Sequence, residues 1–151
     1  MKTNFIFAAV FAAIAAVNAE VTYVCETSDG SPYLHNVQEL IDNLNAAPQG
    51  ENQCNQGPEN GCSGTITGYS GSGGAAYMMC GVGMRCSGDP GGMACAGSCG
   101  GLQSRIIGSY FEGLRDECQA PDSNGDIRVG GIVRMTTGDY VDELKLFSKP
   151  G

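Results

Sequence analysis

The chain has 151 residues and a formal net charge of −8 at pH 7, and its eight basic residues form no run. Because phosphate backbones and anionic membranes are bound through clustered lysine and arginine, this composition argues against nucleic acid or anionic lipid as a partner. The excess of acid favours solubility, and a basic peptide is the charged partner that it would suit.

The first nineteen residues predict a signal peptide for export. Lys2 precedes an apolar stretch over residues 5–17, and Val17-Asn18-Ala19 is typical of a cleavage site. That stretch is too short to cross a membrane, which takes about 20 apolar residues. We therefore expect a secreted, extracellular protein without a membrane span, formed by a single domain over residues 20–151.

Cysteine content predicts covalent cross-links. The chain has eight cysteines, all after the signal segment, and an even number in an exported chain indicates four disulfides. Eight cysteines allow 105 pairings, among which the sequence does not choose. Each bridge would stabilise the fold by about 2–4 kcal/mol. The cysteines are Cys25, Cys54, Cys62, Cys80, Cys86, Cys95, Cys99 and Cys118.

In chain order, the first elements are a strand and an amphipathic helix. Val21–Val24 favours a strand, and Ser31 followed by Pro32 is typical of the N-cap and first position of a helix. The helix should end before Pro48, and residues 48–64 should form a polar loop. Its apolar face repeats at steps of three and four and comprises Leu34, Val37, Leu40, Ile41 and Leu44.

The middle of the chain predicts a hairpin, a long loop and a second helix. Thr65–Tyr69 and Ala75–Gly81 read as two strands joined by a glycine-serine loop. Residues 82–101 form a glycine-rich loop. A second amphipathic helix follows over Leu102–Cys118, and its apolar positions are Leu102, Ile106, Ile107, Tyr110, Phe111, Leu114 and Cys118.

The last third of the chain predicts a turn and two extended segments. Asp122-Ser123-Asn124-Gly125 is typical of a turn. Ile127–Met135 favours a strand in which Gly130-Gly131 indicates a bulge or a close backbone approach. Tyr140–Phe147 suits either a final strand or an extended tail.

These elements define the expected fold class. Their order is β-α-β-β-α-β with an optional fifth strand, which predicts an α+β two-layer sandwich. Two helices should cover one face of a four- or five-stranded antiparallel sheet, stapled by disulfides.

Several short motifs resemble those of small cysteine-rich secreted proteins of fungi. The segment Tyr23-Val24-Cys25-Glu26-Thr27-Ser28-Asp29-Gly30-Ser31-Pro32 is similar to their mature start, and the helix Val37–Leu44, Met79-Cys80-Gly81, Cys118 and Arg128-Val129-Gly130-Gly131 match in order. The chain thus resembles the killer-toxin-like and necrosis-inducing effector groups. That resemblance implies two helices on a four-stranded sheet, no catalytic residues, and action on a host plant or a competing microbe. The long loop 82–101 departs from their pattern.

Catalytic sets are hard to assemble from this sequence. His35 is the single histidine and follows a core-facing leucine, so we expect a partly exposed helix residue instead of a general base. The serine-rich segment 68–73 fails the G-x-S-x-G pattern of serine hydrolases. A carboxylate-based hydrolase stays open as a minor alternative, because sixteen acidic residues supply many pairs.

Three motifs of cofactor or metal sites have simpler explanations. Residues 71–76 match the dinucleotide pattern G-x-G-x-x-A, but a strand should follow where the motif needs a helix. Asp122, Asn124 and Asp126 alternate as in a calcium loop, yet the later ligands are missing and a turn is favoured. Met78, Met79, Met84 and Met93 lie among cysteines and would suit copper only if the thiols were reduced. We therefore expect no cofactor and no metal.

The sequence favours a non-enzymatic binding protein. We expect a secreted effector or toxin-like protein that acts on an extracellular protein or cell surface of a host or competitor, with an inhibitor or antimicrobial protein as the alternative. Binding residues concentrate on loops held by a rigid scaffold, which points to residues 48–63 and 82–101. Within the second loop the candidate contacts are Arg85, Asp89, Pro90 and Met93.

Overall fold

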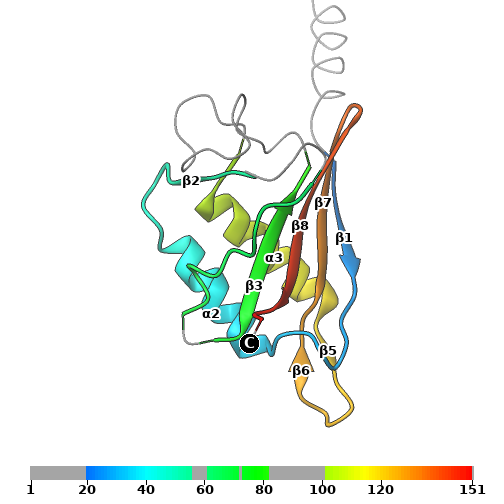
Figure 1. The fold of residues 1–151 in the computed structure, drawn as a ribbon. Coiled ribbons are helices and arrows are strands. Elements are labelled where there is room, and N and C mark those ends of the chain that lie inside the picture. Colours follow the sequence, from blue (N-terminus) through cyan, green and yellow to red (C-terminus); the bar gives the residue numbers. More distant parts are fainter. Residues whose placement is uncertain (1–19, 56–60, 72, 82–100, 151) are drawn as a thin grey trace, which may run out of the picture.

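The main sheet has four antiparallel strands in the order β1-β7-β8-β3 (Figure 1). A computed structural model describes residues 20–55, 61–71, 73–81 and 101–150 of the chain. The strands are β1 (Glu20–Cys25), β3 (Ala75–Cys80), β7 (Gly131–Thr137) and β8 (Tyr140–Ser148). The sequence left Tyr140–Phe147 as either a strand or an extended tail. This segment is a strand, β8, and it lies inside the sheet.

Two helices pack against each other and against the sheet. These are α2 (Leu34–Asn45) and α3 (Ser104–Cys118). Helix α3 contacts β1 and β7, whereas α2 contacts β3, and Figure 1 shows both helices on the same side of the sheet. The α+β class and the four-stranded antiparallel sheet are thus confirmed.

Two short ribbons complete the described fold. Strand β2 (Asn52–Gln53) pairs with β4 (Leu102–Gln103), just before α3. Strand β5 (Ala120–Pro121) pairs with β6 (Ile127–Arg128), just after it. Both ends of α3 are therefore anchored by a backbone ladder.

The hydrophobic core lies between the helices and the sheet. Tyr77 and Phe111 are fully buried, and their rings meet edge to face with centroids 5.3 Å apart, a favoured aromatic geometry. Helix residues spaced three or four positions apart here pack against alternate residues of the strands, as the sequence pattern predicts. Besides the two rings, the core includes Val37, Leu40, Ile41, Leu44, Met79, Ile107, Leu114, Val133, Leu144 and Leu146.

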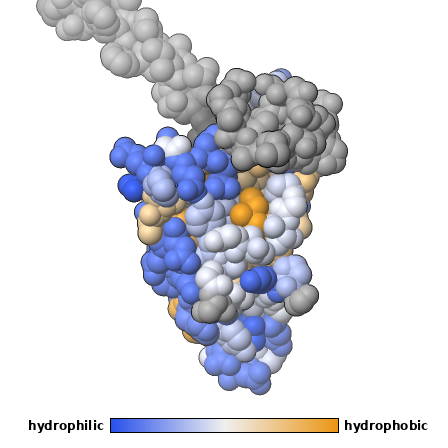
Figure 2. Space-filling model, turned by 60° about the vertical axis from the view of Figure 1, so that its left-hand side comes forward, coloured by the Kyte–Doolittle hydropathy of each residue, from blue (hydrophilic) through white to orange (hydrophobic). Residues whose placement is uncertain are grey.

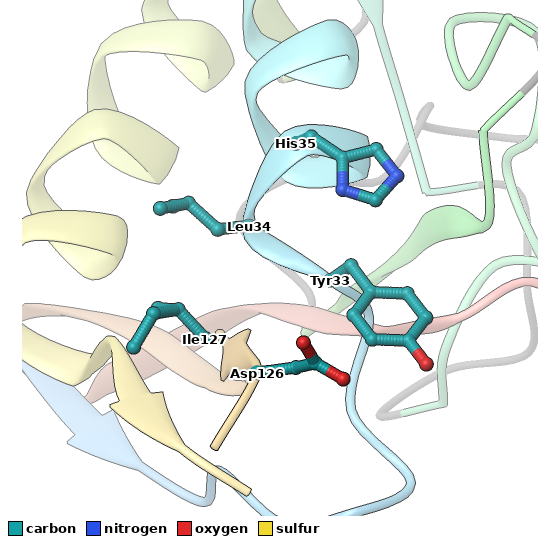
Figure 3. Close-up of a pocket in the computed structure, with 5 residues that line it drawn as sticks. All are labelled: Tyr33, Leu34, His35, Asp126 and Ile127. Carbon is teal, nitrogen blue, oxygen red and sulfur yellow. The ribbon is translucent and has the colours of Figure 1, made fainter. Parts of the chain in front are cut away.

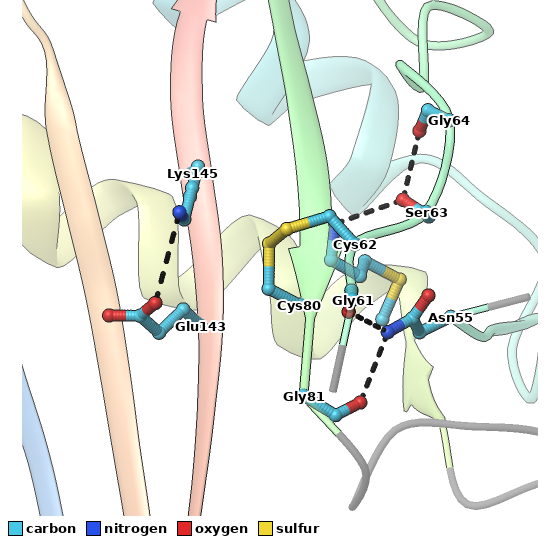
Figure 4. Close-up of a disulfide and its surroundings, with 10 residues drawn as sticks. Asn55, Gly61, Cys62, Ser63, Gly64, Cys80, Gly81, Glu143 and Lys145 are labelled. Carbon is cyan, nitrogen blue, oxygen red and sulfur yellow. Dashed lines mark hydrogen bonds and ion pairs between the residues drawn. A yellow bond between two sulfur atoms is a disulfide. The ribbon is translucent and has the colours of Figure 1, made fainter. Parts of the chain in front are cut away.

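Disulfides link elements that are far apart in the sequence. Cys25 at the end of β1 is bonded to Cys118 at the end of α3, 93 residues later, and Cys62 is bonded to Cys80 of β3 (Figure 4). Cys54 is disulfide-bonded as well. The expected oxidation is confirmed for these five cysteines, while Cys86, Cys95 and Cys99 lie outside the described residues.

The expected hairpin over residues 65–81 is wrong in its first half. This segment forms no strand of its own, and it is joined to β3 by isolated bridges, Cys62 with Cys80 and Ile66 with Tyr77, and by hydrogen bonds between Ser63 and Met79. Tyr69 turns away, since its carbonyl accepts from Asn43 of α2 and its hydroxyl from Gln53. The β-α-β-β-α-β order is therefore not confirmed, and the chain visits the main sheet and helices in the order β1, α2, β3, α3, β7, β8.

The expected start of the first helix is also wrong. Tyr33 occupies the N-cap without a capping side chain, whereas the buried Ser31 hydroxyl accepts from the backbone N–H of Ser28. The carbonyl of Pro32 accepts from Val129, so a tertiary contact replaces the local cap. The helix does end before Pro48, as expected.

The second helix begins later than expected. Residues Leu102 and Gln103 form β4 because they pair with β2, and the helix starts at Ser104. Ile106 was placed on the apolar face but is 40% exposed. Its neighbour Ile107 takes the core position instead.

The glycine pair between β6 and β7 makes the predicted close backbone approach. A Cβ on Gly130 would lie 2.3 Å from Ser31 Oγ, and one on Gly131 would lie 2.3 Å from the carbonyl oxygen of Val24. Gly131 also has φ +151°, a conformation that favours glycine. Side chains here would push β1 and the Ser31 segment away from β7.

Candidate binding surface

A shallow pocket of about 480 Å³ lies between the start of α2 and strand β6 (Figure 3). It is lined by Tyr33, Leu34, His35, Asp126 and Ile127, which we call the Tyr33 surface. Tyr33 and Ile127 are 36% and 37% exposed, so two large apolar side chains at this pocket face solvent. The pocket has room for a small ligand or a partner side chain.

Aromatic stacking holds the rings of this surface. The rings of Tyr33 and His35 are nearly parallel, with centroids 5.6 Å apart and an interplanar angle of 14°. The guanidinium carbon of Arg128 lies 3.8 Å from the centroid of the Tyr33 ring, a cation–π contact. An isolated backbone bridge also joins Tyr33 to Arg128, so the ring is fixed before any partner arrives.

The Arg128 side chain is itself held by several partners. Its Nε donates to Asp122 Oδ2 at 2.6 Å and its Nη1 to the carbonyl of Ser31 at 2.8 Å. The hydrogen bond from Arg128 is the main reason that the pKa of Asp122 lies below its ordinary value, and the reciprocal bond raises the pKa of Arg128. The pair is charged at neutral pH and positions the cation over the ring.

The turn between β5 and β6 carries the former calcium candidates. Asp122 Oδ1 accepts from the backbone N–H groups of Asn124 and Asp126, which is an aspartate-capped turn. Its other oxygen accepts from Arg128, so both carboxylate oxygens of Asp122 are already hydrogen-bonded within the chain. The expected turn is confirmed, and the described residues contain no group of three potential metal ligands.

A second aspartate supports the same turn from outside. Asp29 accepts from both the backbone N–H and the hydroxyl of Ser123. These bonds lower the pKa of Asp29, with the hydroxyl as the larger cause. The loop before α2 is thus tied to the β5–β6 turn.

A polar cluster at the start of α3 is partly buried and centres on the fully buried Ser104. The hydroxyl of Ser104 donates to Glu51 Oε1 at 2.9 Å, and Gln53 Nε2 donates to the Tyr69 hydroxyl at 2.8 Å. Ser104 is completely inaccessible, so its hydroxyl is not available as a nucleophile. The cluster fixes β2, β4 and the 61–71 segment together.

The two loops that were expected to contact a partner are described only in part. Cys54 and Asn55 are buried, and Asn55 donates to the carbonyls of Gly61 and Gly81 (Figure 4). In the described part of loop 48–63, Cys54 and Asn55 are therefore held inward, whereas residues 48–50 are exposed. Loop 82–100 lies outside the described residues, and with it the four candidate contacts Arg85, Asp89, Pro90 and Met93.

Hydrophilic residues dominate the described part of the face drawn in Figure 2, including its lower end, where the β5–β6 ribbon lies. Hydrophobic colour is confined there to small areas. Recognition through a small pocket with polar and aromatic walls fits such a surface better than a broad apolar interface does.

No family model, curated protein or solved structure matches this chain. In the described part of the chain, no helix is both long and apolar enough to cross a bilayer. The chemistry of the Tyr33 surface is therefore argued from its own residues.

The sequence reasoning missed this surface because it treated its members separately. His35 was expected as a partly exposed helix residue, which its exposed position confirms, and Tyr33 and Arg128 were given no role. The available signal was the aspartate turn directly before Ile127-Arg128. A turn of that type returns the chain and presents the residues after it to a neighbouring element.

Proposed function

We propose that this chain is a secreted, non-enzymatic binding protein of the effector or toxin-like kind, which acts on an extracellular protein or cell surface. The disulfides carry the proposal, because every described cysteine is oxidised and disulfides persist in oxidising compartments. The apolar leader and its cleavage site agree with export.

The proposed scaffold is a two-layer α+β sandwich in which a disulfide joins the helix layer to the sheet. The Cys25–Cys118 bond joins the outer strand β1 to the last turn of α3, so the layers cannot separate at that point while the bond is intact. Such cross-linking suits a protein that must keep a binding surface in shape outside the cell.

A binding role also agrees with the composition of the pocket. His35 and Asp126 line it, but its lining includes neither serine nor cysteine, so these described residues make no nucleophilic triad. The same residues supply an aromatic platform and a carboxylate, which are groups used in recognition.

An activity assay with a redox control tests the proposal. Oxidised protein from a secretory host is infiltrated into plant tissue and added to cultures of competing microbes, beside protein that has been reduced and alkylated. We expect a response in one of the two systems from the oxidised form alone. The growth assay identifies an antimicrobial protein, and tissue response identifies an effector.

A substrate panel provides the opposing outcome. The proposal predicts no turnover of glycans, peptides or esters. Hydrolysis that disappears when one acidic residue is replaced would show a carboxylate-based enzyme instead.

A further inference from the structure

Asp126 carries a carboxylate of the Tyr33 surface that is not paired within the described part of the chain. The residue is exposed, and among the described residues its side chain has no hydrogen bond or ion pair, since only its backbone N–H and carbonyl bond to Asp122. Figure 3 shows the carboxylate between Ile127 and the ring of Tyr33. A negative charge is thus presented within an aromatic and apolar pocket.

The positive charge nearest to this carboxylate along the chain is already committed. Arg128 donates to Asp122 and to the carbonyl of Ser31, and its guanidinium lies against the Tyr33 ring. An anionic ligand would therefore have to displace existing bonds, whereas a cationic ligand would not. The pocket therefore favours a cationic ligand over an anionic one.

The apolar walls of the pocket indicate that the ligand has an apolar part as well as a charge. Leu34 and Ile127 line the pocket beside Asp126, and Ile127 is 37% exposed. A flexible aliphatic stem that ends in a cation would cover these side chains while its charge reaches the carboxylate. Lysine and arginine side chains have this construction.

The surroundings favour the same ligand at longer range. Asp29, Asp122 and Asp126 lie at this end of the molecule, where Arg128 is bonded to Asp122, and the whole chain carries a net charge of −8. A field of this sign accelerates the approach of a basic partner and opposes an acidic one.

We propose that the Tyr33 surface binds a lysine or arginine side chain of a basic segment in an extracellular partner protein, with Asp126 as the charge-pairing residue. This inference rests on the proposed binding function and adds the chemical class of the partner. Arg128 acts as a positioning residue, because it holds the Tyr33 ring and leaves Asp126 free to pair.

The test is a titration of the oxidised, secreted protein followed by NMR amide shifts. The probe is a capped peptide of alternating lysine and glycine, compared with the same peptide acetylated on every lysine and with its glutamate counterpart. We expect shifts at Tyr33, His35, Asp126 and Ile127 with the lysine peptide alone. No response, an equal response to the acetylated peptide, or shifts located elsewhere would overturn the proposal.

Charge-matched variants separate a local site from general attraction. Asp126→Asn should weaken binding about two- to fivefold, as for an exposed ion pair. Asp139→Asn makes the same charge change in the β7–β8 turn at the opposite end of the molecule (Figure 1) and should leave binding unchanged. Equal losses in the two variants would contradict a defined site.

Ring-matched variants test the aromatic wall. Tyr33→Ala should weaken binding about two- to fivefold, while Tyr140→Ala, at a residue that is 58% exposed in the distant β8, should have no effect. Amide spectra outside the mutated region report folding of each variant. Because the readout is peptide binding, its failure leaves the tissue and growth assays of the proposed function unaffected, and the reverse also holds.

Discussion

The helix–sheet core and the Tyr33 surface each contain an aromatic side chain in contact with another, but different forces hold them. In the core, Phe111 meets Tyr77 with both rings fully buried, so removal from water dominates. At the surface, Tyr33 is held by Arg128 and a backbone bridge while a third of it remains exposed. Under the proposed function, stability and recognition therefore depend on separate residues, and each can be changed without the other.

Truncating one ring from each region should give the largest contrast. Phe111→Ala leaves a cavity in the core and should lower the free energy of unfolding by about 3–5 kcal/mol. Tyr33→Ala removes a partly exposed ring and should cost less than about 1 kcal/mol. Urea denaturation of the oxidised protein measures both. Similar losses would show that the Tyr33 end is part of the cooperative core.

The two described disulfides should differ in strength. The Cys25–Cys118 bond closes a segment of 93 residues and the Cys62–Cys80 bond one of 18. If restriction of the unfolded chain dominates, losing the first through paired serine substitutions costs about 1.5 kcal/mol more than losing the second. Thermal denaturation of the two double variants tests this order, and the reverse order would show that native packing around Cys80 dominates.

Removing either of two tyrosine hydroxyls should change the free energy of unfolding, but in opposite directions. The Tyr77 hydroxyl is buried without a hydrogen-bond partner among the described residues, and burial raises its pKa. Tyr77→Phe should therefore raise the free energy of unfolding by about 1 kcal/mol. Tyr69→Phe deletes the same atom but loses the bond from Gln53, and should lower it by about 1 kcal/mol. A loss in Tyr77→Phe would indicate that water satisfies this hydroxyl.

Acid should loosen the Tyr33 end before the core. The bond from Arg128 lowers the pKa of Asp122, and bonds from Ser123 lower that of Asp29. A carboxyl whose pKa is lower in the folded state stabilises above its unfolded value, near pH 4, and this contribution is lost as pH falls through the folded value. Protection factors from hydrogen exchange should therefore fall around residues 122–129 first.

Asp122→Asn provides the control for this acid effect. It removes the titrating group, so the β5–β6 ribbon should be less protected at neutral pH and should change less on acidification. Unchanged acid sensitivity in this variant would assign the effect to other carboxyl groups.

The sequence predicted the elements whose signal lies in their own residues. Both helices follow from apolar spacing, and β1, β3 and β7 overlap predicted strands, since these signals depend only on neighbouring residues. For β8 the sequence left a strand and an extended tail open. The failures occur where a distant contact replaces a local one. Ser31 bonds backward to Ser28 because Pro32 pairs with Val129, and Leu102 leaves the helix for a strand opposite Gln53.

The turn between β7 and β8 was missed although a local signal existed. Gly138-Asp139 is a two-residue loop with Gly138 at φ +58° between the paired Thr137 and Tyr140, and glycine followed by aspartate is a recognised hairpin sequence. For the Tyr33 surface the local signal, the aspartate turn before Ile127, marks only one of the segments that form it. Its residues come from two segments some ninety positions apart, which only the tertiary structure brings together.

The account rests on covalent cross-linking of an exported chain, and mass spectrometry of protein secreted from a eukaryotic host tests this most directly. With all eight cysteines oxidised, the intact mass should be about 8 Da below that of the reduced chain, one hydrogen for each thiol. The first residue should be Glu20, and peptide mapping should recover Cys25 linked to Cys118 and Cys62 linked to Cys80. Free thiols in the secreted protein, different partners for these four cysteines, or retention of residues 1–19 would contradict it.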